Sequence, residues 1–133
     1  FYDYSSGEKK AYELIGMEVA GDAMEDDPTR SSLILNRIFL PMVIEAIRLL
    51  EARVSNASDI DKTVRLGFNF PLGPLEIADS MGLDTVLEAS EFLRDETGDP
   101  GFAPPPLLRR MVRGGLLGRK TDRGFYVYEE VGA

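Results

Sequence analysis

The pattern of apolar and polar residues predicts one long, strongly apolar helix over residues 31–53. Its apolar side chains recur every three or four residues and cover more than one stripe, which is typical of a helix enclosed on most sides. They are Leu33, Ile34, Ile38, Phe39, Met42, Val43, Ala46, Ile47, Leu49 and Leu50. Pro41 stands inside this helix, where it removes a backbone donor and clashes with the preceding turn. We therefore expect a kink between Arg37 and Pro41.

Asn36 is the polar residue that stands out in this helix, because it lies in an apolar neighbourhood just before the expected kink. A buried amide needs hydrogen-bond partners. In one interpretation Asn36 pairs with backbone groups that Pro41 leaves free, and in the other its amide faces a ligand. The local chemistry does not choose between them.

Shorter helices are predicted on both sides of the central one. A weak helix that contains two glycines spans about residues 8–24, and further helices are expected at about 59–67, 75–81, 84–98 and 107–112. Residues 68–74 form a rigid apolar connection that either plugs the core or walls a pocket. Residues 117–128 read as a turn that leads into an extended tail. Five or six helices without a strand ladder make the fold class all-α.

Composition narrows the possible functions. The 133 residues fit one domain with a hydrophobic core, and the net charge of −8 argues against a nucleic-acid partner. No apolar run is long enough to span a membrane. The chain has no Cys, which fits a cytoplasmic protein, and no His, which excludes a Ser–His nucleophile or a His-based metal site within it. Acid–base chemistry would fall to carboxylates, Lys or Tyr, and no metal-ligand spacing appears.

Two sets of charged residues are candidates for chemistry. The carboxylates Glu45, Asp61, Glu76 and Asp79 are suited to acid–base work, but each stands at a helical or capping position, which favours a structural role. Arg119 and Lys120 lie in a basic, glycine-rich turn. They either meet phosphate groups or belong to a basic surface turn.

The two ends of the chain echo each other. Phe125-Tyr126-Val127-Tyr128 repeats the pattern of Phe1-Tyr2-Asp3-Tyr4. A match of four residues arises by chance, or else the first residues are the tail of a preceding copy of the same domain. The chain begins at Phe1 and not at Met, which suits a piece of something longer. We expect residues 1–30 to be the tail of a preceding module plus a lead-in helix, and residues 31–128 to form one domain.

An ordered series of motifs runs through residues 31–128. In chain order these are Asn36-Arg37-Ile38, Pro41, Glu45-Ala46, Ala57-Ser58, Asp59-Ile60-Asp61, Gly67, Pro71-Leu72-Gly73-Pro74, Asp79, Gly82-Leu83-Asp84, Leu107-Leu108, Gly118-Arg119-Lys120-Thr121 and Gly124-Phe125-Tyr126. The series resembles the C-terminal helical dimerisation domain of 3-hydroxyacyl-CoA dehydrogenases, whose bundle is similar to that of 6-phosphogluconate dehydrogenases.

The resemblance implies part of an enzyme of fatty-acid β-oxidation that oxidises L-3-hydroxyacyl-CoA to 3-oxoacyl-CoA with NAD. In this family a Rossmann domain binds NAD and carries a catalytic His–Glu pair. This chain shows neither the glycine fingerprint nor a His, so we expect it to bind no NAD and to be inactive alone. The helical domain closes over the acyl-CoA, with Asn36 at the reacting centre, and Arg119 and Lys120 could meet the CoA phosphates. A homodimer is expected through the central helix around Ile38, Met42 and Ile47.

The chain departs from the family pattern before Asn36. Residues 13–30 read as helical and acidic, and Ser31-Ser32-Leu33 replaces the usual lead from the Rossmann domain. This looks like the second C-terminal copy of a tandem pair. Two alternatives are therefore a non-catalytic duplicated interaction module and the helical domain of a related NAD(P)-dependent reductase.

Overall fold

The computed structural model describes residues 28–128 and the side chains from residue 33 onward. The expected helix over residues 8–24 and the segment of residues 1–4 lie outside the described residues. The helices are α3 (Pro28–Glu51), α4 (Ala57–Phe68), α5 (Pro74–Met81), α6 (Leu83–Thr97) and α7 (Pro106–Arg113), with 3₁₀ turns η1 (Pro100–Phe102) and η2 (Arg119–Thr121). Between residues 28 and 128 there is no strand, and two isolated antiparallel bridges join Gly118 to Arg123 and Arg123 to Val127. The all-α prediction is confirmed.

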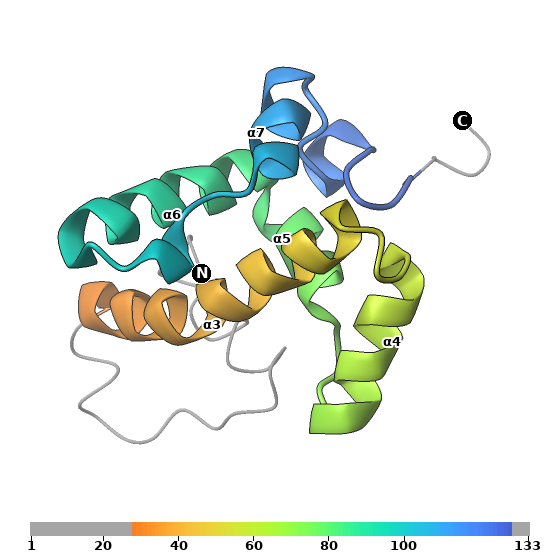
Figure 1. The fold of residues 1–133 in the computed structure, drawn as a ribbon, viewed down its shortest axis with the longest axis horizontal. Helices are drawn as coiled ribbons and strands as arrows, with labels where there is room; N and C mark the ends of the chain where they lie inside the picture. The colour runs from red at the N-terminus through yellow and green to blue at the C-terminus, as the bar shows by residue number, and fades with distance from the viewer. Residues whose placement is uncertain (1–27, 129–133) are drawn as a thin grey trace.

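Helix α3 is the element on which the others assemble. It contacts α4, α5, α6, α7 and η1, and it crosses the middle of the molecule in Figure 1. Leu40, Val43, Ile44 and Ile47 of α3 are at most 1% exposed and belong to one core cluster with residues of all the other α-helices. The apolar face of α3 is thus the centre of the core.

The outer face of α3 corrects the expectation that this helix is enclosed on most sides. Ile38 is 70% exposed, and Leu33 and Ile34 are also exposed. Ile47, which we expected in a dimer interface, is completely buried within the core of its own chain. The reason is geometric, because Ile38 and Ile47 are nine residues apart and a rotation of about 100° per residue puts them on opposite faces.

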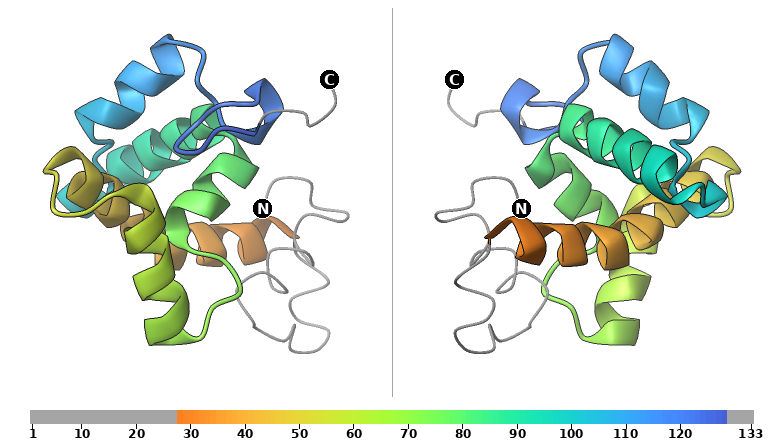
Figure 2. Two further views of the ribbon diagram at one scale, coloured as in Figure 1. Left: turned by 90° about the vertical axis from the view of Figure 1, so that its right-hand side faces the viewer. Right: turned by 90° about the vertical axis from the view of Figure 1, so that its left-hand side faces the viewer.

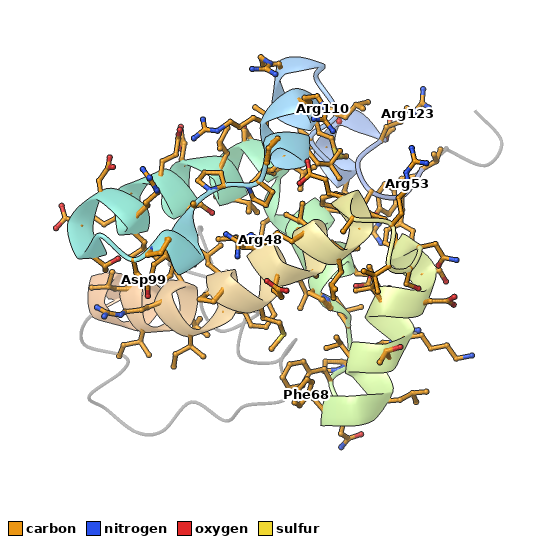
Figure 3. The ribbon with its side chains drawn as sticks, viewed as in Figure 1. Arg48, Arg53, Phe68, Asp99, Arg110 and Arg123 are labelled. Atoms are coloured by element: carbon orange, nitrogen blue, oxygen red, sulfur yellow. The ribbon has the colours of Figure 1, made fainter. Side chains whose placement is uncertain are left out.

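Pro41 lies inside α3 without ending it. The helix continues to Glu51, and in Figure 1 its ribbon changes direction between the orange first half and the yellow second half. A bend of this kind is expected where proline removes a backbone donor and crowds the preceding turn. Further along α3, Arg48 (labelled in Figure 3) donates to the carbonyls of Pro100 (3.3 Å) and Ala103 (3.4 Å), in and just after η1.

Helix α4 and the loop after it differ in detail from the prediction. Asn56 caps α4, its side chain accepting from the Asp59 N–H at 2.8 Å, and the helix ends at Phe68 before the left-handed Asn69. Phe70 and Leu72 pack against the core cluster, so this part of the loop plugs the core. Phe68 instead projects from the end of α4 and is 62% exposed (Figure 3). No helix of the described residues is long and apolar enough to cross a membrane.

The segment after α7 folds back on α5 and the start of α6. Figure 2 shows this blue segment beside the green helix α5, and η2 contacts α5. The Leu83 N–H donates to the Leu117 carbonyl at 2.9 Å. Gly118 has a φ of +106°, and a Cβ there would collide with the backbone of Asp79. Glycine is therefore required for this close approach.

We predict that Gly118→Ala destabilises the protein by about 1–3 kcal/mol from backbone strain alone, with the collision adding to this. Gly67→Ala is the matched control, because a Cβ at this helical position has nothing within 4 Å. The control should be neutral, or more stable by up to about 1 kcal/mol. Urea unfolding of both variants checks the difference, and equal stabilities would contradict the close approach of the segment to α5.

Candidate functional site

Asn36 lies in the first half of α3 and is half-buried. Its Oδ1 atom is buried and has no hydrogen-bond partner in the part of the chain that the structure describes. Between residues 28 and 128, no hydrogen bond of this side chain supports the interpretation in which Asn36 satisfies backbone groups freed by Pro41. An orphaned buried polar group costs about 1–3 kcal/mol. An unpaired buried amide oxygen is therefore a candidate for meeting a ligand.

Asp61 of α4 is completely buried and fastens two other segments. Its carboxylate accepts from the N–H groups of Leu75 (2.8 Å) and Glu76 (3.0 Å) at the start of α5, and from the Tyr126 hydroxyl (2.5 Å). Burial raises the pKa of Asp61, and the hydrogen bonds from Tyr126 and Leu75 oppose this rise. A Cβ on Gly73 would collide with the Asp61 side chain, so glycine is needed beside it.

Asp79 of α5 is 1% exposed and holds the C-terminal segment. Its oxygens accept from the N–H groups of Phe125 and Tyr126, both at 3.0 Å, and from the Tyr128 hydroxyl at 2.7 Å. Burial raises the pKa of Asp79, whereas these hydrogen bonds lower it. Tyr126 thus joins both carboxylates, binding Asp79 through its backbone and Asp61 through its hydroxyl.

The other two candidate carboxylates are engaged nearer the surface. Glu76 accepts from the Gly73 N–H (2.8 Å) and from Arg65 (2.6 Å). Glu45 is exposed on α3 and pairs with Arg48 at 3.5 Å. All four carboxylates proposed for acid–base work therefore have protein partners in this fold. Acid–base chemistry by any of them would first have to break these contacts.

Arg119 and Lys120 are exposed on η2 and contact other parts of the chain. The Lys120 ammonium pairs with Asp84 at 2.7 Å, and the Arg119 guanidinium lies 4.4 Å from the centre of the Tyr128 ring. No hydrogen bond or ion pair among residues 28–128 joins either of them to Asn36. Their contact with CoA phosphates stays a prediction.

The sequence analysis named Tyr126 and Tyr128 in the repeated Phe-Tyr-x-Tyr pattern, and Tyr126 also in the motif series, but it did not predict that they bind buried carboxylates. The signal that could have revealed it is the spacing, because two tyrosines two residues apart in an extended segment point the same way. Both hydroxyls bind buried carboxylates. As for metals, no group of three or more candidate ligands occurs in the part of the chain that the structure describes.

The class of protein follows from a family match. In the described residues, a long helix with an Asn-Arg pair is followed by shorter helices and a Gly-Phe-Tyr segment that returns to α5. A family model described as the C-terminal domain of 3-hydroxyacyl-CoA dehydrogenase matches residues 33–128. The chain belongs to this family.

Relatives support the same assignment. The chain is 42% identical over 99 residues to 3-hydroxybutyryl-CoA dehydrogenase of Mycobacterium tuberculosis, covering 74% of this chain and 35% of that protein. It is 46% identical over 114 residues to the enzyme of that name from Bradyrhizobium diazoefficiens, covering 86% of this chain and 37% of that protein. The chain thus spans about a third of the length of the curated relatives it matches.

Solved structures show the same partial match. A (S)-3-hydroxybutyryl-CoA dehydrogenase from Ralstonia eutropha gives a TM-score of 0.70 at 46% identity, covering 73% of this chain and 34% of that one. A 3-hydroxybutyryl-CoA dehydrogenase from Escherichia coli K12 gives 0.70 at 34% identity, covering 76% of this chain but only 22% of that one. Chains that contain this domain therefore differ in length.

We predict that the free energy of unfolding falls as the pH rises above 10, the ordinary pKa of tyrosine. Burial and the hydrogen bonds to Asp61 and Asp79 raise the pKa of Tyr126 and Tyr128. The folded protein therefore keeps protons that the unfolded chain releases, and stability present below pH 10 is lost as the pH rises.

The check is urea unfolding between pH 7 and pH 11 of the parent chain and of Tyr126→Phe/Tyr128→Phe. The variant should be less stable at pH 7, by about 1–3 kcal/mol for each carboxylate that loses a hydroxyl donor. Its stability should also fall less steeply above pH 10. Identical slopes in the two proteins would contradict the pairing of these hydroxyls with carboxylates.

Proposed function

We propose that this chain is the helical C-terminal part of an NAD-dependent dehydrogenase that oxidises L-3-hydroxyacyl-CoA to 3-oxoacyl-CoA in fatty-acid β-oxidation. The observation that carries the proposal is the family match over residues 33–128, which spans nearly all of the described domain. The names of the relatives favour a short acyl chain, since several are 3-hydroxybutyryl-CoA dehydrogenases. A cytoplasmic location stays a prediction.

Asn36 is the residue through which this chain takes part in the reaction. In the proposed enzyme, a bound NAD would supply the hydride acceptor, and the histidine that takes the hydroxyl proton would belong to a Rossmann domain that residues 28–128 do not include. The Asn36 amide then orients the reacting oxygen. Its Nδ2 donates to the substrate oxygen, first in the alcohol and then as that atom becomes a ketone, while the single hydroxyl proton goes to the histidine.

A neutral amide suits this role because it adds no charge to the site. Its hydrogen bond strengthens as electron density builds on the substrate oxygen, and such interactions accelerate the chemical step. The buried and unpartnered Oδ1 of Asn36 supports the proposal. The Asp61 and Asp79 carboxylates, in contrast, already accept hydrogen bonds from within the domain.

The outer face of α3 supports a second role, the pairing of two copies of this domain. Ile38 is 70% exposed and Ile34 42% exposed, while Met42 and Leu49 on the same side are half-buried. These residues stand four, four and seven residues apart, and they form a stripe along the helix that is apolar except for the exposed Glu45, seven residues after Ile38. Exposed apolar patches of this kind mark interfaces, and a two-fold axis is the commonest way to bury them. We propose a homodimer through this stripe.

We predict that Asn36→Ala in the full-length enzyme lowers kcat about 10²-fold, the size of effect seen when one transition-state hydrogen-bond donor is removed. The melting midpoint should not fall, because Oδ1 has no hydrogen-bond partner to lose within the described chain. Glu45→Gln on the exposed side of the same helix is the matched control and should keep the parent kcat. Unchanged turnover with a lowered midpoint would contradict the catalytic role.

A separate prediction concerns assembly. Ile38→Asp should weaken the dimer more than tenfold, because each two-fold interface would bury two unpaired carboxylates. Val54→Asp is the control, since Val54 is equally exposed (67%) but lies beyond the end of α3. Sedimentation equilibrium measures both variants. A monomeric parent protein, or equal dissociation constants for both variants, would contradict the proposed dimer interface on α3.

A further inference from the structure

The outer face of α6 carries two carboxylates around an exposed aromatic ring. Glu88, Phe92 and Asp95 stand four and three residues apart, so they lie on one face of the helix. Phe92 is 55% exposed, and Glu88 and Asp95 are exposed as well. Neither carboxylate forms an ion pair or a hydrogen bond among the described residues. These three residues form an acidic stripe without a partner in the described domain.

A basic stripe on α7 lies beside the acidic stripe. It consists of Arg109 and Arg113, which stand one helical turn apart and are both exposed. The Arg109 guanidinium pairs with Glu91 of α6 at 2.8 Å, and Glu91 stands three residues after Glu88 on the same side of that helix. The Arg113 side chain has no ion pair in the part of the chain that the structure describes. The two stripes therefore run next to each other on one surface, as α6 and α7 do in the right-hand view of Figure 2.

Charges of opposite sign are separated between these two regions of the chain. Residues 84–99 hold six acidic side chains and one arginine, whereas residues 109–123 hold six basic side chains and one aspartate. Two ion pairs join the regions within one chain, Arg109 with Glu91 and Lys120 with Asp84. Solubility favours interspersed charges of both signs, so it does not account for this separation. Carboxylates on α6 and guanidinium groups on α7 remain available for a partner.

We infer that the surface formed by the two stripes binds the same surface of a second copy of this chain. A two-fold axis through this surface places each stripe opposite the other stripe of the second copy, so that unlike charges meet in both halves of the contact. Phe92 then lies against arginines of the second copy, and its ring attracts a guanidinium group. A partner with charges of one sign would attract one stripe and repel the other, which favours a second copy as the partner.

This surface is separate from the apolar stripe of α3. Helices α6 and α7 contact α3 through the shared core, whereas Ile38 on the outer face of α3 is 70% exposed. The two surfaces do not overlap, and one chain can use both. Two different two-fold contacts on one chain are the arrangement found in symmetric tetramers. The inference does not depend on the proposed role of Asn36 or on the dimer through α3.

The first experiment isolates the new contact with Ile38→Asp, which disrupts the α3 stripe. Sedimentation equilibrium of this variant compares about 0.1 M with about 1 M NaCl, because the screening length falls from about 10 Å to about 3 Å. We expect dimers at the lower salt concentration and a dissociation constant roughly tenfold or more higher at the other. A monomer at the lower salt concentration, or dimers that are indifferent to salt, overturns the inference. Either outcome leaves the family assignment and the α3 interface intact.

The second experiment exchanges charges between the stripes in the same Ile38→Asp background. Glu88→Lys/Asp95→Lys and Arg113→Glu are the two variants, and their melting midpoints should match the parent because these side chains lose no partner within the described chain. Each variant alone should self-associate roughly tenfold or more weakly, since like charges then face each other. An equimolar mixture should associate more tightly than either variant, because the exchanged charges then meet their opposites. A mixture that associates no more tightly overturns the inference.

The aromatic ring has a matched control on another helix. Phe92 and Phe68 are similarly exposed, at 55% and 62%, but Phe68 stands at the end of α4, far from α7 in Figure 3. In the Ile38→Asp background, Phe92→Ala should raise the dissociation constant roughly tenfold, as the loss of an aromatic anchor does. Phe68→Ala should leave it unchanged. Equal dissociation constants for these two variants overturn the inference.

Discussion

The domain depends on keeping two buried carboxylates fully bonded. A carboxylate taken out of water is tolerated only when hydrogen bonds replace its hydration. Asp61 and Asp79 meet this condition with N–H groups from the start of α5 and from the C-terminal segment, and with two tyrosine hydroxyls. The position of α5 against α4 and the return of the chain after α7 both follow from it. The glycines at 73, 118 and 124 follow as well, since any side chain there would intrude on these aspartates.

The same requirement distinguishes the two aspartates from Asn36, the residue proposed to contact the substrate. Asp61 and Asp79 find partners within the domain, whereas the Asn36 amide oxygen is buried and unpaired in the described chain. The domain supplies hydrogen-bond donors to both aspartates but no partner to the Asn36 amide oxygen among the described residues, which supports a partner from outside the domain. Asn36 also stands on α3, the helix on which the core assembles. A substrate-orienting group is best held by such a packed element.

Local patterns predicted much of this fold because its helices are defined by neighbours in sequence. The 3.6-residue period located α3, and glycines and prolines placed the breaks around α5 and α7 close to where they occur. The same patterns wrongly predicted Ile47 in a dimer interface, because the sequence pattern of an apolar residue is the same whether it lies in the core or on an exposed face. They also missed the bond of Asp79 to Phe125, because 46 residues separate the partners and no local period reports such a contact. Asn36 stood out as a polar residue in an apolar helix, and the resemblance suggested its role, but only the structure could show that its amide oxygen is unpaired.

The tyrosine segment stands at the end of the described domain, which affects the stability of chains that stop before it. A ribosome that stops early, or a protease that clips the chain before Phe125, leaves α3 to α7 in place but strips both aspartates of their distant donors. The shortened product loses these stabilising hydrogen bonds and therefore spends more of its time open to degradation. Full stability of the domain therefore requires the segment of residues 125–128, because this segment supplies hydrogen bonds to both buried aspartates.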